Sequence, residues 1–302
     1  MNKLVKGLAL ALFASVAYAL WSILSDVVVS LNRVNYFDYL IIFEASLTVL
    51  SLALVFVFKG YRKEGKRKSN KRLFTYSLLA GMFFGLGTII FFALIGNQNY
   101  PFVASASYIS VIPFVFFIAK AKKQDPKLLA ILGTIAVFAG LVFQIIGLYG
   151  YDFYAAAPII LLTALMTVFW TAGYYILLIS MVFKGYNILK SDVLMGVFEF
   201  LTVGVYGLLT GAFREIFSLT SLEVLLSILV AGFLLLGGLS EEFSFRLLIR
   251  FKEKYLDLWN VLVSLEIVGI AIFSIFFLTL YYPLLIAGLA LIIAGVILII
   301  IS

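Results

Sequence analysis

The chain has no cysteine and no histidine among its 302 residues, and only 12% of its residues are charged. Without cysteine it can form no disulfide, no thiolate nucleophile and no cysteine-based metal site. Without histidine it lacks the commonest protein metal ligand and the side chain best suited to titrate near neutral pH. Any proton coupling would therefore depend on carboxyl groups. No Gly-x4-Gly-Lys-Ser/Thr loop is present, so direct use of ATP is not expected.

Apolar residues, by contrast, make up 64% of the chain, and the mean hydropathy is +1.17. Soluble domains are about half apolar and about a quarter charged, so the composition indicates an integral membrane protein. A membrane-spanning helix needs about 20 apolar residues. The sequence predicts ten such all-α spans, near 7–31, 37–58, 74–96, 101–119, 128–148, 156–181, 191–212, 222–246, 257–279 and 283–301. Membrane-length runs without strict alternation favour helices over a β-barrel.

The first residues resemble a secretory signal, because Lys3 and Lys6 precede an apolar run and Ala17-Tyr18-Ala19 has the pattern of a cleavage site. The apolar run continues through Val29, and its pattern recurs around Trp170. We therefore expect this segment to be retained as the first span.

Lysine and arginine are distributed unevenly over the connections between the ten spans. Only Arg33 and Arg214 of the 22 fall on one side of the membrane under this topology. The positive-inside rule then predicts a plasma-membrane protein with both termini in the cytoplasm. The net charge of +7 follows from this distribution. The cluster within 59–72 could attract anionic lipid headgroups, and nothing in the sequence indicates nucleic-acid binding.

Several motifs occur twice in the same order. Trp21 recurs 149 residues later as Trp170, and the other motifs recur with an offset of 155: Phe43-Glu44 as Phe198-Glu199, Gly133 as Gly288, and Ala139-Gly140 as Ala294-Gly295. Each half, 1–152 and 153–302, contains five predicted spans, and an odd number inverts the second half relative to the bilayer. Inverted repeats are typical of secondary transporters, whose substrates bind near the midplane between the halves.

Polar residues form matching stripes on the first and sixth spans: Ser15, Tyr18, Ser22, Ser25 and Asp26 on one, and Thr167, Thr171, Tyr174 and Tyr175 on the other. Their spacing places each set on one helix face. Because hydroxyl groups facing lipid stay unsatisfied, we expect the stripes to face each other across a central cavity. The alternative is hydrogen bonding between helices by serine and threonine, which is common in membrane bundles. Trp21 and Trp170, also within these spans, would either stack against substrate or pack in the core.

Four carboxyl groups, those of Asp26, Glu44, Glu199 and Glu266, fall within predicted spans. Charges deep in a bilayer are costly and usually mark a cavity, a partner or a function. We interpret Glu44 and Glu199 as proton sites or as ligands for a substrate amine, the alternative being protonated structural glutamates. Asp26 lies nearer the outer surface and could simply be hydrated.

Three further features are interpreted as structural. Glu242 and Arg246, next to Glu241, are spaced for a local ion pair, although a gate salt bridge is the alternative. Pro113 is expected to kink the fourth span. The glycines at 133 and 140, and those at 288 and 295, are seven residues apart, so each pair predicts a close-packing helix face.

Motifs along nearly the whole chain also carry a family resemblance: Ala93-Leu94, Ala104-Ser105-Ala106-Ser107, Ile112-Pro113-Phe114, Leu129, Gly133 and Gly140, then Leu265-Glu266-Ile267-Val268, Gly288 and Gly295. Their order and duplication resemble the EamA-type transporters of the drug/metabolite transporter superfamily. That resemblance implies ten helices around a central cavity, alternating access, and often export of amino acids or other small metabolites. The chain departs from the family pattern at Glu44, where many members have a basic residue, and in lacking the second-half proline.

Together these observations predict a secondary active or facilitative carrier, not an enzyme, that exports a small amphipathic metabolite such as an amino acid. The alternatives are proton-coupled efflux of cationic or hydrophobic compounds, and a non-transporting membrane subunit or lipid-handling protein that keeps the fold. The expected partners are the substrate, the bilayer and protons, in a monomer or homodimer with no cofactor or metal. The candidate substrate-binding residues are Tyr18, Trp21, Ser22, Asp26, Glu44, Tyr108, Thr167, Trp170, Thr171, Tyr175, Glu199 and Glu266.

Overall fold

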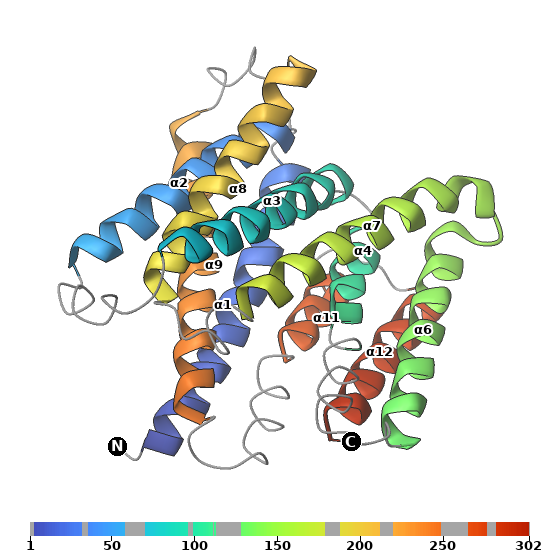
Figure 1. Ribbon diagram of the computed structural model, residues 1–302. Helices are drawn as coiled ribbons and strands as arrows, with labels where there is room; N and C mark the ends of the chain where they lie inside the picture. Colours follow the sequence, from blue (N-terminus) through green and yellow to red (C-terminus); the bar gives the residue numbers. More distant parts are fainter. Residues whose placement is uncertain are drawn as a thin grey trace.

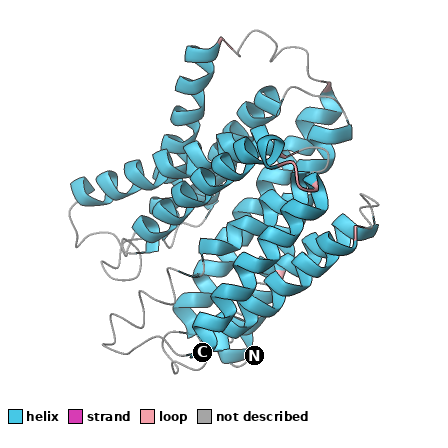
Figure 2. Ribbon diagram, turned by 90° about the vertical axis from the view of Figure 1, so that its right-hand side faces the viewer, coloured by secondary structure: helices cyan, strands magenta, loops and turns pink. Residues whose placement is uncertain are grey.

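The computed structural model describes residues 3–31, 36–57, 70–95, 99–110, 112, 128–178, 188–211, 220–248, 265–276 and 282–301. These residues form ten α-helices and one short 3-10 helix, with no strand among them (Figure 2). The helices are α1 (Lys3–Leu31), α2 (Tyr36–Val57), α3 (Asn70–Leu94), α4 (Tyr100–Ala106), α6 (Leu128–Tyr149), α7 (Phe153–Leu178), α8 (Ile188–Thr210), α9 (Ser221–Leu248), α11 (Glu266–Phe276) and α12 (Pro283–Ile301). The 3-10 helix η3 (Ser107–Ser110) continues directly from α4.

Helix length and composition confirm the prediction of an all-α, multi-pass membrane protein. Within the described residues, seven helices (α1, α2, α3, α6, α7, α8 and α9) are long and apolar enough to cross a bilayer. Helices α11 and α12 are also apolar but shorter. The predicted span 101–119 begins with α4 and η3, and most of its second half lies outside the described residues.

The helices pack in pairs that join elements distant in the sequence. Helix α1 lies along α9, α3 along α7, α2 along α8, and α6 along α12 (Figure 1). Helix α3 also packs against α8, and α2 against α9. Every one of these helix pairs therefore joins the first half of the chain to the second.

Both chain ends lie at the lower end of the molecule in Figures 1 and 2.

Glycines allow α6 and α12 to approach backbone to backbone. A Cβ atom on Gly133 would lie 2.5 Å from the carbonyl oxygen of Gly295, and one on Gly140 would lie 2.6 Å from that of Gly288. The contacts are reciprocal, because a Cβ on Gly288 or Gly295 would meet the carbonyl of Gly140 or Gly133 at 2.5 and 2.6 Å. Real Cβ atoms do not come so close to backbone, so the prediction of close-packing glycine faces is confirmed.

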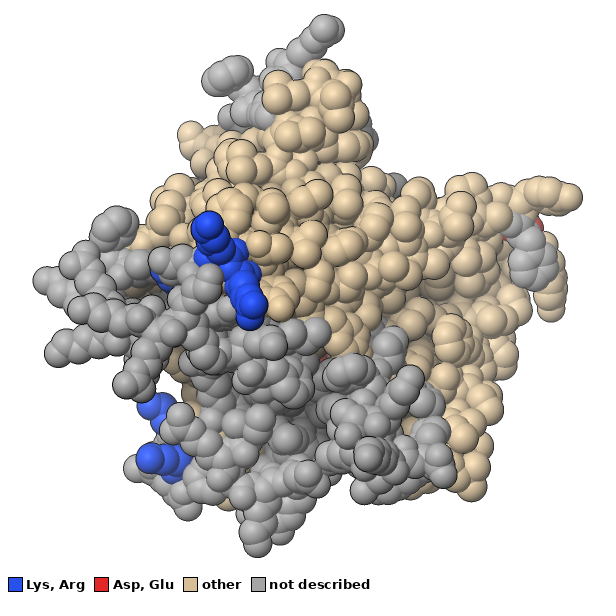
Figure 3. Space-filling view, viewed as in Figure 1, with Lys and Arg blue, Asp and Glu red and all other residues tan. Residues whose placement is uncertain are grey.

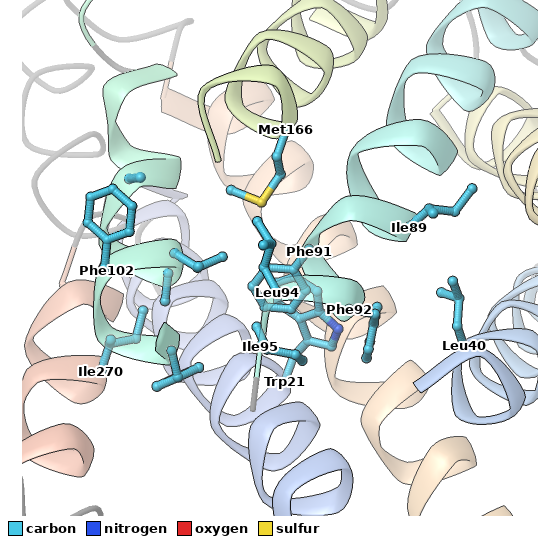
Figure 4. Close-up of a cluster of buried hydrophobic side chains, with 14 of the residues drawn as sticks. Trp21, Leu40, Ile89, Phe91, Phe92, Leu94, Ile95, Phe102, Met166 and Ile270 are labelled. Atoms are coloured by element: carbon cyan, nitrogen blue, oxygen red, sulfur yellow. The ribbon is translucent and has the colours of Figure 1, made fainter. Parts of the chain in front are cut away.

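Apolar side chains are abundant both inside and on the surface. Leu161, Leu208 and Leu209 are 70%, 74% and 82% exposed, a pattern that suits contact with lipid tails rather than water. In the view of Figure 3, most of the described surface is uncharged, and the basic side chains that can be seen lie on its left side. The interior contains one large apolar cluster around Trp21 and Phe91 (Figure 4).

Candidate functional site

The two repeated tryptophans meet in the interior. The ring of Trp21 in α1 stacks on Phe91 of α3, with centroids 5.4 Å apart. Trp170 of α7 lies 6.2 Å from Trp21 and 5.2 Å from Phe91. Trp21 is 9% exposed, and Figure 4 places it beside Phe91 and below Met166. The two tryptophans pack on each other in this arrangement, as the core-packing interpretation expects.

The two repeated glutamates also meet. Glu44 of α2 and Glu199 of α8 lie close enough for their carboxyl groups to act on each other through charge. Glu44 is 0% exposed and Glu199 is 5% exposed. Thr88 of α3 donates a hydrogen bond to Glu199 Oε1 over 3.1 Å. Trp170 Nε1 in turn donates to Thr88 Oγ1 over 3.4 Å, so the paired acids are connected to the paired tryptophans.

Close helix packing fixes the backbone of this site. A Cβ on Gly81 of α3 would lie 3.0 Å from the backbone nitrogen of Glu199, and one on Gly85 would lie 3.1 Å from its carbonyl oxygen. Thr48 of α2 donates a hydrogen bond to the carbonyl oxygen of Gly196 over 3.1 Å. Helices α2 and α3 therefore both hold the turn of α8 that carries Glu199.

A third acid, Glu241 of α9, joins the two stripe-bearing helices. Tyr18 of α1 donates a hydrogen bond to Glu241 Oε2 over 2.6 Å, and Tyr174 of α7 donates to Oε1 over 3.2 Å. Gly237 and Gly238 leave room for the Tyr18 ring, which would lie 3.0 Å from a Cβ on Gly237. One carboxyl group thus bridges α1 and α7 through their hydroxyl side chains.

Polar residues also cluster where α1 meets α4 and α11. The hydroxyl groups of Ser22 and Tyr100 are 3.0 Å apart, and Asp26 and Glu266 lie near Tyr100. Asp26 is 0% exposed and accepts a hydrogen bond from Ser30 over 3.3 Å. The alternative of a hydrated Asp26 therefore does not hold in this arrangement.

The stripe on α7 is used mainly for hydrogen bonds to backbone. Thr171 donates to the carbonyl of Thr167 over 2.6 Å, and Thr167 donates to that of Thr163 over 2.9 Å. Thr167 also lies 3.4 Å from the carbonyl oxygen of Ala106 in α4. The first two bonds lie within α7, so only the contact with Ala106 is of the interhelical kind named as the alternative to a cavity. The hydroxyl of Tyr175 is buried.

Some predicted features fall outside what the structure describes. The side chain of Tyr108, in η3, is one of these, and so are the side chains of Glu242 and Arg246 and the whole of Pro113. Among the described residues, no group of three or more Asp or Glu side chains is placed to hold a metal ion.

Sequence reasoning missed Thr88 and Tyr100 and gave no role to Glu241. Thr88 and Tyr100 carry no repeated motif, and both face their partners only because α3 and α4 cross α7 and α1. The signal that could have identified Glu241 was its position as an acid within a predicted span, which was the criterion applied to Glu44. Glu241 was instead set aside together with its neighbours Glu242 and Arg246, which are spaced for a local ion pair.

Comparison of the chain with models of known protein families, and with the sequences of curated proteins, finds no match. The case for a function therefore depends on the fold and on these polar and aromatic contacts.

Proposed function

We propose that this protein is a membrane carrier that exports a small amphipathic metabolite, such as an amino acid, by alternating access between two inverted five-helix repeats. The observation that carries the proposal is that repeated residues from the two halves meet each other, Trp21 with Trp170 and Glu44 with Glu199. In inverted-repeat transporters, substrate and ion sites lie where the repeats meet.

The helix pairs support a two-fold relation between the halves. If α1, α2, α3 and α6 correspond to α7, α8, α9 and α12, the α1–α9 pair corresponds to the α3–α7 pair, and α2–α9 corresponds to α3–α8. The pairs α2–α8 and α6–α12 then correspond to themselves. The glycine contacts follow the same rule, because Gly133 meets Gly295 while Gly140 meets Gly288. Reciprocal contacts of this kind are expected across a two-fold axis.

The chemistry of the central contacts suits a solute with both apolar and polar parts. Trp21 and Trp170 offer aromatic faces, while Ser22, Asp26 and Glu266 offer hydroxyl and carboxyl oxygens that would bind an amine. A pocket of largely apolar lining with a few oriented polar groups is typical of small-molecule sites. In the arrangement observed the tryptophans occupy this space themselves, so substrate entry requires that α1 and α7 separate.

Glu241 supplies a contact that would close one route into the site. It holds Tyr18 and Tyr174 together on the side of the tryptophans that the positive-inside rule assigns to the cytoplasm. We place both termini on that side of the plasma membrane. Rupture of the Tyr18–Glu241–Tyr174 bridge would then accompany opening toward the cytoplasm.

Thermal stability in detergent tests the proposal directly. A ligand that binds only the folded state stabilises it by about 2.7 kcal/mol when its concentration is 100 times Kd. We expect one class from a panel of amino acids, amines and sugar phosphates to raise the apparent melting temperature, and Ser22→Ala or Trp170→Phe to reduce the shift. Uptake of that solute into proteoliposomes by counterflow is the functional measurement.

The opposite result would favour a different function. If no solute class stabilises the protein and none exchanges in proteoliposomes, the fold serves a non-transporting membrane subunit or a lipid-handling protein. The control variant is Tyr154→Phe, because Tyr154 is 95% exposed at the start of α7 and lies outside the proposed site.

A second candidate function is proton-coupled efflux of cationic or hydrophobic compounds. The observation that favours it is the burial of Glu44 and Glu199 beside each other. A cationic compound would then compete with protons for these acids. Stabilisation by hydrophobic cations, and not by zwitterions, would distinguish this function from amino-acid export.

A further inference from the structure

Glu44 and Glu199 make a contact that their ordinary charge states do not explain. The carboxyl group of Glu44 faces that of Glu199, to which Thr88 donates its hydrogen bond. With both carboxyl groups deprotonated, neither oxygen of Glu44 has a hydrogen-bond partner among the described side chains. The two oxygens are completely buried and face a second carboxyl group, so something positive is needed between them.

The surroundings of the pair are apolar and aromatic. Phe43, next to Glu44, is 0% exposed and lies 5.6 Å, centroid to centroid, from Phe92, which is also 0% exposed. Tyr39 lies 5.2 Å from the same ring. In such a medium two adjacent negative charges repel far more strongly than in water. Carboxyl groups in contact therefore hold a shared proton, or bind a cation, and titrate as one unit.

Charged and titratable groups on the packed helices lie elsewhere along their elements. Those whose side chains the structure describes and that are acidic or basic are Asp38 on α2, Lys71 and Arg72 on α3, Lys190 and Asp192 on α8, and Glu223 and Glu241 on α9. Lys71 and Arg72 lie more than four turns before Thr88, and Lys190 lies more than two turns before Glu199. Glu241 is held by Tyr18 and Tyr174.

The pair also has a direct connection to the proposed substrate site. Glu199 Oε1 accepts a hydrogen bond from Thr88, and Thr88 Oγ1 accepts one from the indole of Trp170. Trp170 is packed on Trp21. A change in the charge of the pair therefore alters the hydrogen bond between Thr88 and Trp170. In the other direction, movement of α7 shifts Trp170 and so alters the hydrogen bond that Thr88 donates to Glu199.

We propose that Glu44 and Glu199 form one binding site for a single exchangeable monovalent cation, a proton or a sodium ion, held between the two carboxyl groups. The atoms that would bind the cation are all oxygens, the ligand type that hard cations prefer. The hydroxyl oxygen of Thr88 adds to the carboxyl oxygens on the Glu199 side. Binding leaves the pair with one net negative charge, and release leaves two. The inference deepens the proposed function by naming its coupling ion, but cation binding can be measured whether or not transport occurs.

Tryptophan fluorescence provides the test because Thr88 connects Glu199 to Trp170 by hydrogen bonds. The chain has three tryptophans, so a Trp259→Phe background confines the signal to Trp21 and Trp170. Purified protein is titrated with pH in choline chloride, and separately with sodium chloride against choline chloride at constant ionic strength and pH. Infrared difference spectra record the C=O stretch of protonated carboxyl groups in the same samples.

We expect a single reversible fluorescence step in one of the two titrations, lost in Glu44→Gln and in Glu199→Gln. A step with pH that removes a protonated-carboxyl band identifies a proton, and a step with sodium at constant pH identifies sodium. Glutamine is nearly isosteric, and its amide can donate a hydrogen bond to the remaining carboxylate, so these variants should fold. Glu223→Gln is the matched control and should keep the step, because Glu223 lies at the start of α9 and its carboxyl group bonds to the neighbouring Thr220.

A step that persists unchanged in both folded glutamine variants, or the absence of any step in either titration, would overturn the proposal. Circular dichroism verifies that each variant is folded, and either single variant suffices. Counterflow in proteoliposomes separates this result from the proposed function. Solute exchange without a cation-linked step overturns the cation site alone, whereas a step without exchange of any solute overturns the carrier function alone.

Discussion

The indole of Trp170 donates a hydrogen bond to Thr88 Oγ1 over 3.4 Å, and this one contact joins the aromatic centre of the protein to its buried acids. Thr88 passes the connection on to Glu199. Trp21, by contrast, packs on Trp170 through its ring, and its own indole nitrogen is buried without a described acceptor. The two repeated tryptophans therefore differ in that, among the described contacts, only the indole nitrogen of Trp170 is connected by hydrogen bonds to the buried acids.

This difference predicts different energetic coupling to Thr88. Thr88→Val combined with Trp170→Phe should show a coupling free energy of about 0.5–1.5 kcal/mol, because each change removes one partner of the same hydrogen bond. Thr88→Val combined with Trp21→Phe should be additive within about 0.5 kcal/mol. Unfolding in detergent measures the double-mutant cycles, and equal coupling for both tryptophans would contradict the assignment.

The Glu241 bridge predicts unequal effects of its two tyrosines. Tyr18→Phe should destabilise the protein more than Tyr174→Phe, because its hydrogen bond is 2.6 Å long and the other is 3.2 Å. Hydrogen bonds to charged groups contribute about 1.5–3 kcal/mol each. The double variant should lose more stability than the two single variants lose together, since it leaves the Glu241 carboxyl group with no tyrosine donor.

Apparent melting temperatures of the four proteins measure this effect, with the exposed Tyr154→Phe as the control that should change little. Equal costs for Tyr18→Phe and Tyr174→Phe, or simple additivity, would show that Glu241 does not depend on both hydroxyl groups.

Close packing of α6 on α12 predicts strong sensitivity at the contact glycines. Gly140→Ala would place a methyl group 2.6 Å from the carbonyl oxygen of Gly288. Overpacking of this kind costs about 1–3 kcal/mol. Gly232→Ala is the matched control in α9, where a Cβ meets nothing within 4 Å. It should be neutral or stabilising by up to about 1 kcal/mol, because alanine favours helix.

Circular dichroism during heating compares the two glycine variants. The assignment of the α6–α12 contact is contradicted if Gly140→Ala melts at or above the temperature of Gly232→Ala.

The predicted orientation can be measured because the chain has no cysteine. A single cysteine at Gly65, within the basic connection, should react with a membrane-impermeant thiol reagent only in inside-out vesicles. One at Tyr154, which is 95% exposed, should react in intact cells. The reverse labelling pattern would invert the topology and place the Glu241 bridge on the outer side.

The sequence by itself determined that this is a helical membrane protein, because apolar runs of membrane length leave the backbone no other way to satisfy its hydrogen bonds. It also indicated the close-packing glycines, because a spacing of seven residues places them on one helix face whatever the partner. The repeated motifs singled out Trp21, Glu44 and their counterparts before any contact was known.

Only the tertiary structure decided which of these side chains meet. Helical periodicity fixes the face on which Glu44, Trp170 or Tyr18 lies, but it contains no information on how two helices distant in the sequence cross. The crossings of α2 with α8, and of α3 with α7, bring Glu44 to Glu199 and Thr88 to Trp170. The packing of α9 on α1 also brought Glu241, to which sequence reasoning assigned no role, within hydrogen-bond distance of Tyr18 and Tyr174, because burial and partners are properties of the packed chain.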